Sequence, residues 1–536
     1  MAEEEMNKSW LYRLKPITDS LPTISKPEGH VHFRTKMMWT VGVLIFYFAM
    51  TNVAIYGLSE NTLDIFSEFR AILAGASGSI MHLGIGPIVT GSIIMQLFTG
   101  AKIIELDLTK TEDKAVYQGT QKLLVIIMIF VEAIPQVYGY LEPSAELADT
   151  IGGQYAGGLA KTVIVVQLVA GSYLVFLLDE LVSKWGIGSG ISMFIAAGVC
   201  QGIFTGTLNW IPMDVATAEK YPYIQKFADQ GVPPGTLPKT IFLLQRMSYT
   251  ELSQGGFEYL FLGQPNPILA LIGTIIVFLV VAYVESTRIE LPLAHGKVRG
   301  ARGRYPIRLI YASNIPVILM SALLANVNMF SMLLWSHPEM KKIPYLGHQW
   351  WLGAYQDPET GDPTTKPMYG GAWYVSRING VGEWLLPLMN WERYGTYVGD
   401  HTYWQVLIHV IVYLTVMIVG SVIFAKFWIE TTNMGPEAVA KQIQNSGMQI
   451  PGFRRDPRVL RKVLNRYIPM VTVISGAFVG LLASMADMIG TVGDTSGTGV
   501  LLTVGICIRL YEEIGKEQMM EMHPVLRDFF GGEGGL

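Results

Sequence analysis

Residues 266–284 have the sequence NPILALIGTIIVFLVVAYV, a run of nineteen residues without a charged side chain. A helix rises about 1.5 Å per residue, so a run of this length crosses the roughly 30 Å hydrocarbon core of a lipid bilayer. Similar apolar runs recur along the chain. Half of the 536 residues are hydrophobic and only 15% are charged, whereas soluble domains carry roughly 25% charged residues. The sequence therefore predicts an all-α membrane protein.

Ten apolar runs predict ten transmembrane helices in two sets of five. The first set is expected at Met37–Ser59, Leu83–Ala101, Leu123–Tyr140, Thr162–Leu178 and Ile187–Ile211. The second set is expected at Asn266–Val284, Leu309–Trp335, Thr402–Ala425, Ile468–Ala486 and Thr495–Ile508. We therefore expect an N-terminal half over 37–211 and a C-terminal half over 266–508, joined by a loop over 212–265.

The charge of the segments between these runs orients the chain. With segments 1–36 and 509–536 placed in the cytoplasm, 28 of the 39 Lys and Arg residues lie on the cytoplasmic side and 11 on the other side. Cytoplasmic loops of membrane proteins are enriched in Lys and Arg, so both termini are predicted to be cytoplasmic. The long outer loops are rich in Pro, Gly, Trp and Tyr, which favours folded or membrane-lying extensions over flexible linkers. We expect cytoplasmic loops at 285–308 and 426–467, and outer loops at 212–265 and 336–401.

Several classes of protein are not indicated by this sequence. A net charge of -4 gives no reason to expect DNA binding. The two cysteines, Cys200 and Cys507, lie inside apolar runs, where a disulfide framework is not expected. The chain has no phosphate-binding loop and no zinc-protease motif. We predict no catalytic residue, no metal site and no cofactor, so an intramembrane enzyme is the weakest interpretation.

Corresponding spans of the two sets share an irregularity. The second span contains GIGPIV at Gly84–Val89 and the seventh contains NIPVI at Asn314–Ile318, so both place a proline near the start of a helix. The fifth span begins GSGI at Gly188–Ile191 and the tenth begins GTGV at Gly497–Val500. Because each set has an odd number of spans, the two halves have opposite orientations in the membrane. This pattern predicts an inverted repeat with a pathway between the halves, close to the broken helices.

The side chains beside these irregularities are aliphatic and offer no ligand to an ion. On spacing alone, packing of helix against helix explains them better than a dry constriction that blocks ions. A secondary transporter with inverted repeats, which usually has polar groups at the midplane, is the alternative to a channel. The residues are Ile85, Val89, Ile191, Ile195, Ile318 and Leu502.

Acidic side chains are scarce inside the predicted spans. Glu132 in the third span is the clearest. We expect it to pair with Asn326 or Gln96 rather than to carry protons.

Two cytoplasmic loops carry clusters of basic residues, and two interpretations remain open. The charges anchor the topology and attract anionic lipid, or they grip a large anionic partner through its phosphates. Glycine and proline are interspersed with the charges of the first loop, which favours an ordered, protruding loop. The basic residues considered for docking are Lys297, Arg299, Arg302 and Arg304 in the first loop and Arg454 and Arg455 in the second.

Several motifs, in order along the chain, resemble the SecY protein-translocation channel family, in its archaeal and eukaryotic branch. The similarity runs from about Lys26 to Glu513 and therefore covers nearly the whole chain. The motifs are Gly84–Thr90 (GIGPIVT), Ile94–Phe98 (IMQLF), Gly188–Ser192 (GSGIS), Tyr305–Arg308 (YPIR), Ser313–Val317 (SNIPV), Asn465–Pro469 (NRYIP) and Gly497–Leu502 (GTGVLL).

This resemblance implies an hourglass channel whose two halves close around a ring of apolar residues, which by position are the six aliphatic residues named above. It also implies a short, removable plug helix at Phe66–Ile80, with Phe66, Arg70, Leu73, Gly75 and Gly78. The lateral gate would lie between spans two, three, seven and eight. Glu132 and Asn326 match its polar positions, although the family usually has glutamine where this chain has Glu132.

The resemblance implies the central subunit of a channel that translocates secretory polypeptides and releases transmembrane segments sideways into lipid. The implied partners are nascent polypeptides with their signal sequences, membrane lipid, and two small membrane subunits similar to SecE/γ and β. A ribosome is expected on the basic loops, where Lys297, Arg299 and Arg454 match positions that the family uses. The implied location is the plasma membrane of an archaeal-type cell.

Overall fold

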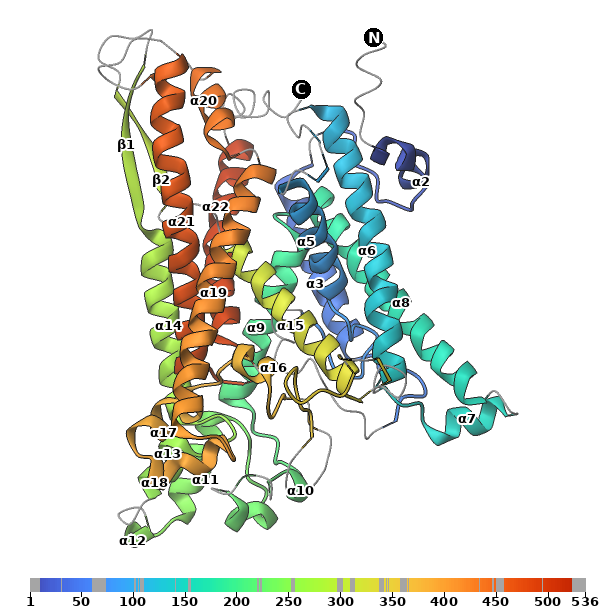
Figure 1. Ribbon diagram of the computed structural model, residues 1–536, viewed down its shortest axis with the longest axis vertical. Helices are drawn as coiled ribbons and strands as arrows, with labels where there is room; N and C mark the ends of the chain where they lie inside the picture. Colours follow the sequence, from blue (N-terminus) through green and yellow to red (C-terminus); the bar gives the residue numbers. More distant parts are fainter. Residues whose placement is uncertain are drawn as a thin grey trace.

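The computed structural model describes the chain from residue 10 to residue 522. Within this range the description omits residues 30, 60–73, 101–102, 105, 107–109, 140, 153–155, 219–220, 222–223, 252–255, 296–301, 309–313, 337–341, 344, 346, 357–363, 365, 433, 446–447, 450–456 and 494. The described chain is helical apart from one small sheet and three isolated bridges. Figure 1 shows long helices standing side by side, with shorter elements gathered at both ends.

Ten long helices overlap the ten predicted spans. In the first half they are α3 (Phe33–Thr51), α5 (Gly86–Gly100), α6 (Thr111–Gly139), α8 (Ala156–Trp185) and α9 (Gly190–Leu208). In the second half they are α14 (Ile268–Ser286), α15 (Ile315–Ser336), α19 (Tyr403–Thr431), α21 (Pro457–Ile489) and α22 (Gly497–Met522). Within the described residues, seven of them are long and apolar enough to cross a membrane on length and composition alone; α3, α5 and α22 fall outside that criterion.

Several helices extend beyond the apolar runs that predicted them. The helix α6 begins at Thr111 rather than at Leu123, and α21 begins at Pro457 rather than at Ile468. Hydropathy marks where a helix enters the hydrocarbon core, but charged and polar turns continue the same helix in water. Pro457 suits the first position of a helix, because the N–H that proline lacks would have no partner there.

The prolines of the paired irregularities lie in first turns and do not interrupt a continuing helix. Residues 81–85 form turns, with Gly84 at a φ of +55°, and α5 begins only at Gly86, immediately before Pro87. Likewise α15 begins at Ile315, immediately before Pro316. The predicted break is therefore a late helix start, which shortens α5 to 15 residues.

The largest apolar cluster joins the two halves. It contains Tyr47 from α3, Val89 from α5, Phe194 from α9, Val317 from α15 and Leu501 from α22, all of them buried. The core of the molecule thus lies at the junction of the halves, where a pathway between them was expected.

The outer loops are folded, as predicted. The first outer loop, 212–265, forms a small core of its own that includes Phe227, Leu243 and Leu260. The loops also contact each other, because Arg393 forms an ion pair with Glu258. Their elements are α10 (Val215–Ala218), η2 (Gln225–Gln230), α11 (Thr236–Arg246), α12 (Tyr249–Glu251), α13 (Phe257–Leu262), α16 (Gly371–Val375), η5 (Val381–Glu383), α17 (Leu385–Met389), α18 (Trp391–Tyr394) and η6 (Gly395–Val398). A further short helix, α7 (Ala145–Ile151), precedes α8.

The first basic loop forms an antiparallel hairpin of β1 (Arg288–His295) and β2 (Arg302–Arg308). The short strand β3 (Met448–Gln449) of the second basic loop pairs with the other edge of β1. The described residues of the first basic loop are therefore ordered, and they are tied to the second basic loop. In Figure 1 the hairpin lies at the same end of the molecule as α20 (Pro436–Asn445) and the N-terminal elements η1 (Trp10–Leu14) and α2 (Lys15–Asp19). The helices α10 to α13, α17 and α18 lie at the opposite end, and α16 lies between them and the middle of the molecule.

Candidate functional site: an aliphatic constriction beside a polar seam

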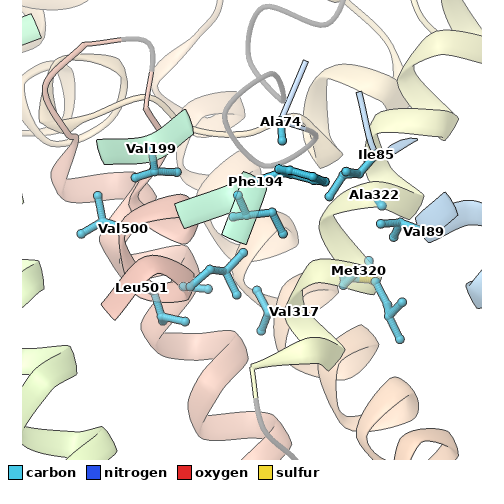
Figure 2. Packing of buried hydrophobic residues seen from close by; sticks show 14 of the residues in the cluster. Ala74, Ile85, Val89, Phe194, Val199, Val317, Met320, Ala322, Val500 and Leu501 are labelled. Carbon is cyan, nitrogen blue, oxygen red and sulfur yellow. The ribbon is translucent and has the colours of Figure 1, made fainter. Parts of the chain in front are cut away.

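The structure brings the six aliphatic residues beside the helix starts into one apolar cluster. Ile85, Val89, Ile195 and Leu502 are each at most 5% exposed and belong to its buried core. Ile191 and Ile318 are half-buried and pack against that core. In the first half the residues come from α9, α5 and the turn before α5. In the second half they come from α15 and α22, so each half of the chain supplies part of the cluster. Figure 2 shows Ile85 and Val89 gathered with Val317, Val500 and Leu501 around Phe194.

Phe194 was not singled out from the sequence, although it occupies the middle of this cluster. Its ring stacks on that of Tyr47, with the ring centroids 4.5 Å apart. Val199, Val317 and Leu501 join it in the buried core. The sequence signal for Phe194 is that α9 is apolar on several faces, which is typical of helices buried in a membrane protein.

The predicted plug lies only partly within the described residues. Phe66, Arg70 and Leu73 lie outside them. Gly75 and Gly78 lie in residues 74–80, which form turns and a bridge between Ala54 and Ser79.

The helix predicted for the plug therefore does not extend over its C-terminal end. Gly78 has a φ of +66°, a conformation that interrupts a helix and that glycine tolerates best. The N–H of Ile55 donates to the carbonyl of Gly78, and the N–H of Ile80 donates to that of Val53, both at 2.9 Å. These bonds hold the segment against the end of α3.

The described end of this segment is nevertheless anchored in the apolar cluster. Ala74 is 3% exposed and belongs to the same cluster as Ile85. The hydroxyl of Tyr47 donates a hydrogen bond to the carbonyl of Ala74. Figure 2 shows Ala74 at one end of the cluster, next to Ile85 and Phe194.

A polar seam lies beside this apolar cluster, between α5, α6 and α15. The hydroxyl of Thr90 lies 2.9 Å from Oε1 of Glu132, and Nδ2 of Asn326 lies 3.1 Å from the same hydroxyl oxygen. The expected pairing of Glu132 with Asn326 is therefore bridged by Thr90. Glu132 is 4% exposed, so the bridge satisfies a polar group that water hardly reaches.

Two seam residues were missed by the sequence analysis. Thr90 lies in a quoted motif but was not considered as a hydrogen-bonding partner. Gln136 lies one turn after Glu132 on α6, is fully buried, and places Nε2 4.0 Å from Sδ of Met329 on α15. The four-residue spacing of Glu132 and Gln136 places both on one helix face and was the available signal.

A buried lysine holds the outer loop to the start of α14. Nζ of Lys239 donates to the main-chain carbonyls of Gly263, at 2.5 Å, and of Asn266, at 3.2 Å, and also to that of Pro265. Burial lowers the pKa of Lys239 to about 7, because removal from water disfavours the charged form. Among the described residues, no group of three or more His, Cys, Asp and Glu side chains is placed to hold a metal ion.

Comparison with known proteins identifies the family. A family model described as SecY matches residues 79–511, and one described as the plug domain of Sec61p matches residues 45–78. The protein translocase subunit SecY of Halobacterium salinarum is 44% identical over 526 residues, which cover 98% of this chain and 99% of the relative. The chain belongs to the SecY family.

Solved structures agree with this membership. The structure of a protein-conducting channel superimposes with a TM-score of 0.72 at 39% identity, covering 95% of this chain and 98% of the other. Sec61 in the canine ribosome–channel complex from the endoplasmic reticulum superimposes with a TM-score of 0.69, also at 39% identity and with the same coverage. This SecY-family chain is therefore a multi-pass membrane protein and a subunit of a protein-conducting channel. It is not an enzyme, and the transporter alternative is wrong.

Among the basic docking residues, only Arg302 and Arg304 of this SecY-family chain lie within the described backbone. Both belong to β2, where Arg302 is opposite Ala294 and Arg304 is opposite Pro292 on β1. Lys297, Arg299, Arg454 and Arg455 lie outside the described residues.

Proposed function

We propose that the aliphatic cluster is the seal of the closed channel, with Ile85, Val89, Ile191, Ile195, Ile318 and Leu502 as its ring. The observation that carries this proposal is that these residues come from both halves and meet in one buried cluster. An aliphatic constriction excludes ions because no group in it replaces their hydration shell. Aliphatic side chains also yield to an extended polypeptide without recognising its sequence.

The segment from Phe66 to Ile80 would act as the plug on one side of this ring. The match of residues 45–78 to the Sec61p plug model supports this role. So does the burial of Ala74 against Ile85 and the hydrogen bond that Tyr47 donates to it. Among the described contacts between the plug and the cluster, displacement of the plug would break the hydrogen bond from Tyr47 and remove the small side chain of Ala74 from the cluster.

The seam bridged by Thr90 would be the lateral gate, with Glu132 and Asn326 as its polar groups. Polar side chains make the closed seam slightly less stable than an apolar seam would be, and an apolar helix is more favourable in lipid than in water. A sufficiently hydrophobic segment that enters the channel therefore leaves between α6 and α15 into the membrane.

The hairpin β1–β2 and the second basic loop would form the docking surface for a ribosome, through Lys297, Arg299, Arg302, Arg304, Arg454 and Arg455. The pairing of β3 with β1 holds the two basic loops together, which supports a single docking surface. The canine neighbour is a ribosome–channel complex, which supports the same partner here. Both termini would then lie in the cytoplasm, with the channel in the plasma membrane. The partners would also include the nascent polypeptide with its signal sequence and two small subunits similar to SecE/γ and β.

The two sets of five helices, 37–211 and 266–508, would move as halves of the channel. Separation of the halves widens the ring and opens the seam together, because α5 and α15 contribute to both.

The seal is tested by the resting ion conductance of the channel in planar bilayers. We expect Ile85→Gly with Ile191→Gly to let ions pass through a channel that is otherwise closed. The matched control is Ile272→Gly with Ile275→Gly, because both side chains are exposed on α14, away from the cluster. A doubly substituted ring that conducts no more than the unmodified channel contradicts the seal.

A further inference from the structure

Two helices that carry ring residues begin in the same way. The helix α9 carries Ile191 and Ile195, and α22 carries Leu502. Each starts against an aspartate near the C-terminal end of the preceding helix, Asp179 on α8 and Asp487 on α21. These two aspartates have no role in the constriction or in the seam described above.

In the first half, Asp179 binds the main chain at the start of α9. Its Oδ1 accepts a hydrogen bond from the N–H of Ile191 at 2.8 Å. Ile191 is itself a ring residue, so the carboxylate holds the backbone from which that side chain projects.

In the second half, Asp487 makes the corresponding contact with α22. Its Oδ1 accepts from the N–H of Thr498 at 3.0 Å, and its Oδ2 accepts from the Thr498 hydroxyl at 2.7 Å. The hydroxyl of Tyr413 on α19 also donates to Oδ2, at 2.8 Å. Asp487 is 3% exposed, so its carboxylate ties three helices together in a place that water hardly reaches.

The first glycine of each ring helix makes this contact sterically possible. A Cβ added at Gly190 would lie 2.5 Å from Cα of Asp179, and one added at Gly497 would lie 2.1 Å from the carbonyl carbon of Ala486. Real side chains do not approach so closely, so only glycine fits either position. The structure therefore makes Gly190 equivalent to Gly497. Alignment of the motifs GSGI and GTGV would instead pair Gly188 with Gly497, so the two alignments differ by two residues.

We propose that Asp179 and Asp487 are positioning residues that set the height of α9 and α22 along the channel axis and thereby align the ring. This inference rests on the proposed seal. The first N–H groups of a helix have no partner inside it, and a carboxylate satisfies them strongly in a medium of low dielectric constant. Removal of the carboxylate leaves these N–H groups unsatisfied, so the helix start shifts towards other partners and displaces the ring residues it carries.

The test measures resting ion conductance for the full chain, in the complex in which it purifies, for Asp179→Leu and Asp487→Leu. We expect each variant to raise the conductance roughly tenfold. The loss of a strong helix cap shifts the equilibrium between the closed and the leaky channel by about this factor. Asp179→Asn keeps an acceptor for the N–H of Ile191, so it should restore a closed channel. Asp487→Asn should be intermediate, because one amide cannot accept all three hydrogen bonds.

Glu180→Leu is the matched control, since it removes a carboxylate from the adjacent position of α8. Glu180 binds Lys122 at 2.5 Å, Lys184 at 2.8 Å and the N–H of Ile24 at 2.9 Å, and none of these belongs to α9. It should lower the unfolding temperature without raising the conductance. Equal leakage from Glu180→Leu would mean that general destabilisation opens the channel, and it would overturn the proposal.

The ring variant Ile85→Gly with Ile191→Gly separates the two proposals. If it leaks and the folded Asp→Leu variants do not, the positioning role is wrong and the seal stands. If the ring variant does not leak either, the seal itself is wrong. Should the Leu variants fail to fold, Asp487→Asn decides: a raised conductance supports the positioning role, and an unchanged one contradicts it.

Discussion

Asn326 of α15 donates a hydrogen bond to Thr90 of α5 across 3.1 Å, although 236 residues separate them in the sequence. Thr90 also lies 2.9 Å from the Glu132 carboxylate of α6. One hydroxyl therefore joins the two halves of the chain at the proposed lateral gate.

Thr90→Val should make this gate easier to open. The substitution keeps the shape of the side chain but removes the bridge, which destabilises the closed seam by about 1–3 kcal/mol because a buried carboxyl loses its partner. Reporters with signal sequences of graded hydrophobicity should then be translocated at a lower hydrophobicity threshold. Thr415→Val is the control, since the Thr415 hydroxyl is exposed on α19 and bonds only within its own helix. A threshold that does not differ between these variants argues against the bridge.

Tyr47→Phe should loosen the plug without disturbing the ring stack. It removes the hydroxyl that donates to Ala74 but keeps the aromatic contact with Phe194. A typical hydrogen bond contributes about 1 kcal/mol, so the displaced plug should be populated about fivefold more. The measurement is the rate at which a membrane-impermeant maleimide modifies Gly75→Cys, with Cys200 and Cys507 replaced by Ser.

The control for this experiment is Tyr173→Phe, because the Tyr173 hydroxyl bonds to the carbonyl of Pro22, far from the plug in the sequence. If Gly75→Cys is modified at the same rate in the Tyr47→Phe and Tyr173→Phe backgrounds, the hydroxyl of Tyr47 does not hold the plug in place.

Lys239 predicts a pH dependence for the outer loop. Its folded-state pKa of about 7 lies below the unfolded value near 10.4, so between these values the unfolded chain binds a proton that the folded chain does not. Stability therefore rises with pH across this window, by at most about 1.4 kcal/mol per pH unit. Hydrogen exchange of 236–266 between pH 7 and 10 should show increasing protection, and Lys239→Met should abolish the increase. If Lys239→Met still shows protection that increases with pH, another titrating group causes the increase.

Charge reversal at the proposed docking surface should weaken ribosome binding. Arg299→Glu with Arg454→Glu should lower the affinity and reduce the slope of log K against log salt by about one for each lost phosphate contact. Arg393→Glu, the same kind of change at the opposite end of the molecule, should bind as the unmodified channel does. Binding by the double variant with unchanged affinity and salt slope would exclude this surface.

The sequence by itself determined which segments cross the membrane, because hydropathy is a local property that each run of about 20 residues carries alone. The resemblance of its motifs to a known family also predicted the ring positions. Glycine and proline between the charges predicted an ordered loop at 285–308, but not the hairpin that its described residues form. The sequence did not predict where α6 and α21 begin, because hydropathy changes at the membrane boundary whereas each helix continues past it in charged and polar turns.

Only the tertiary structure decided which side chains meet. Thr90, Phe194, Asp179 and Asp487 are unremarkable in the sequence, and each acquires its role from a partner on another helix. The end of the plug segment forms turns because the strand-like bonds of Ile55 and Ile80 compete with helix formation there. Contacts between distant segments depend on how the helices pack against one another. Local composition does not encode that packing, and the arrangement of the two halves around the constriction follows from it.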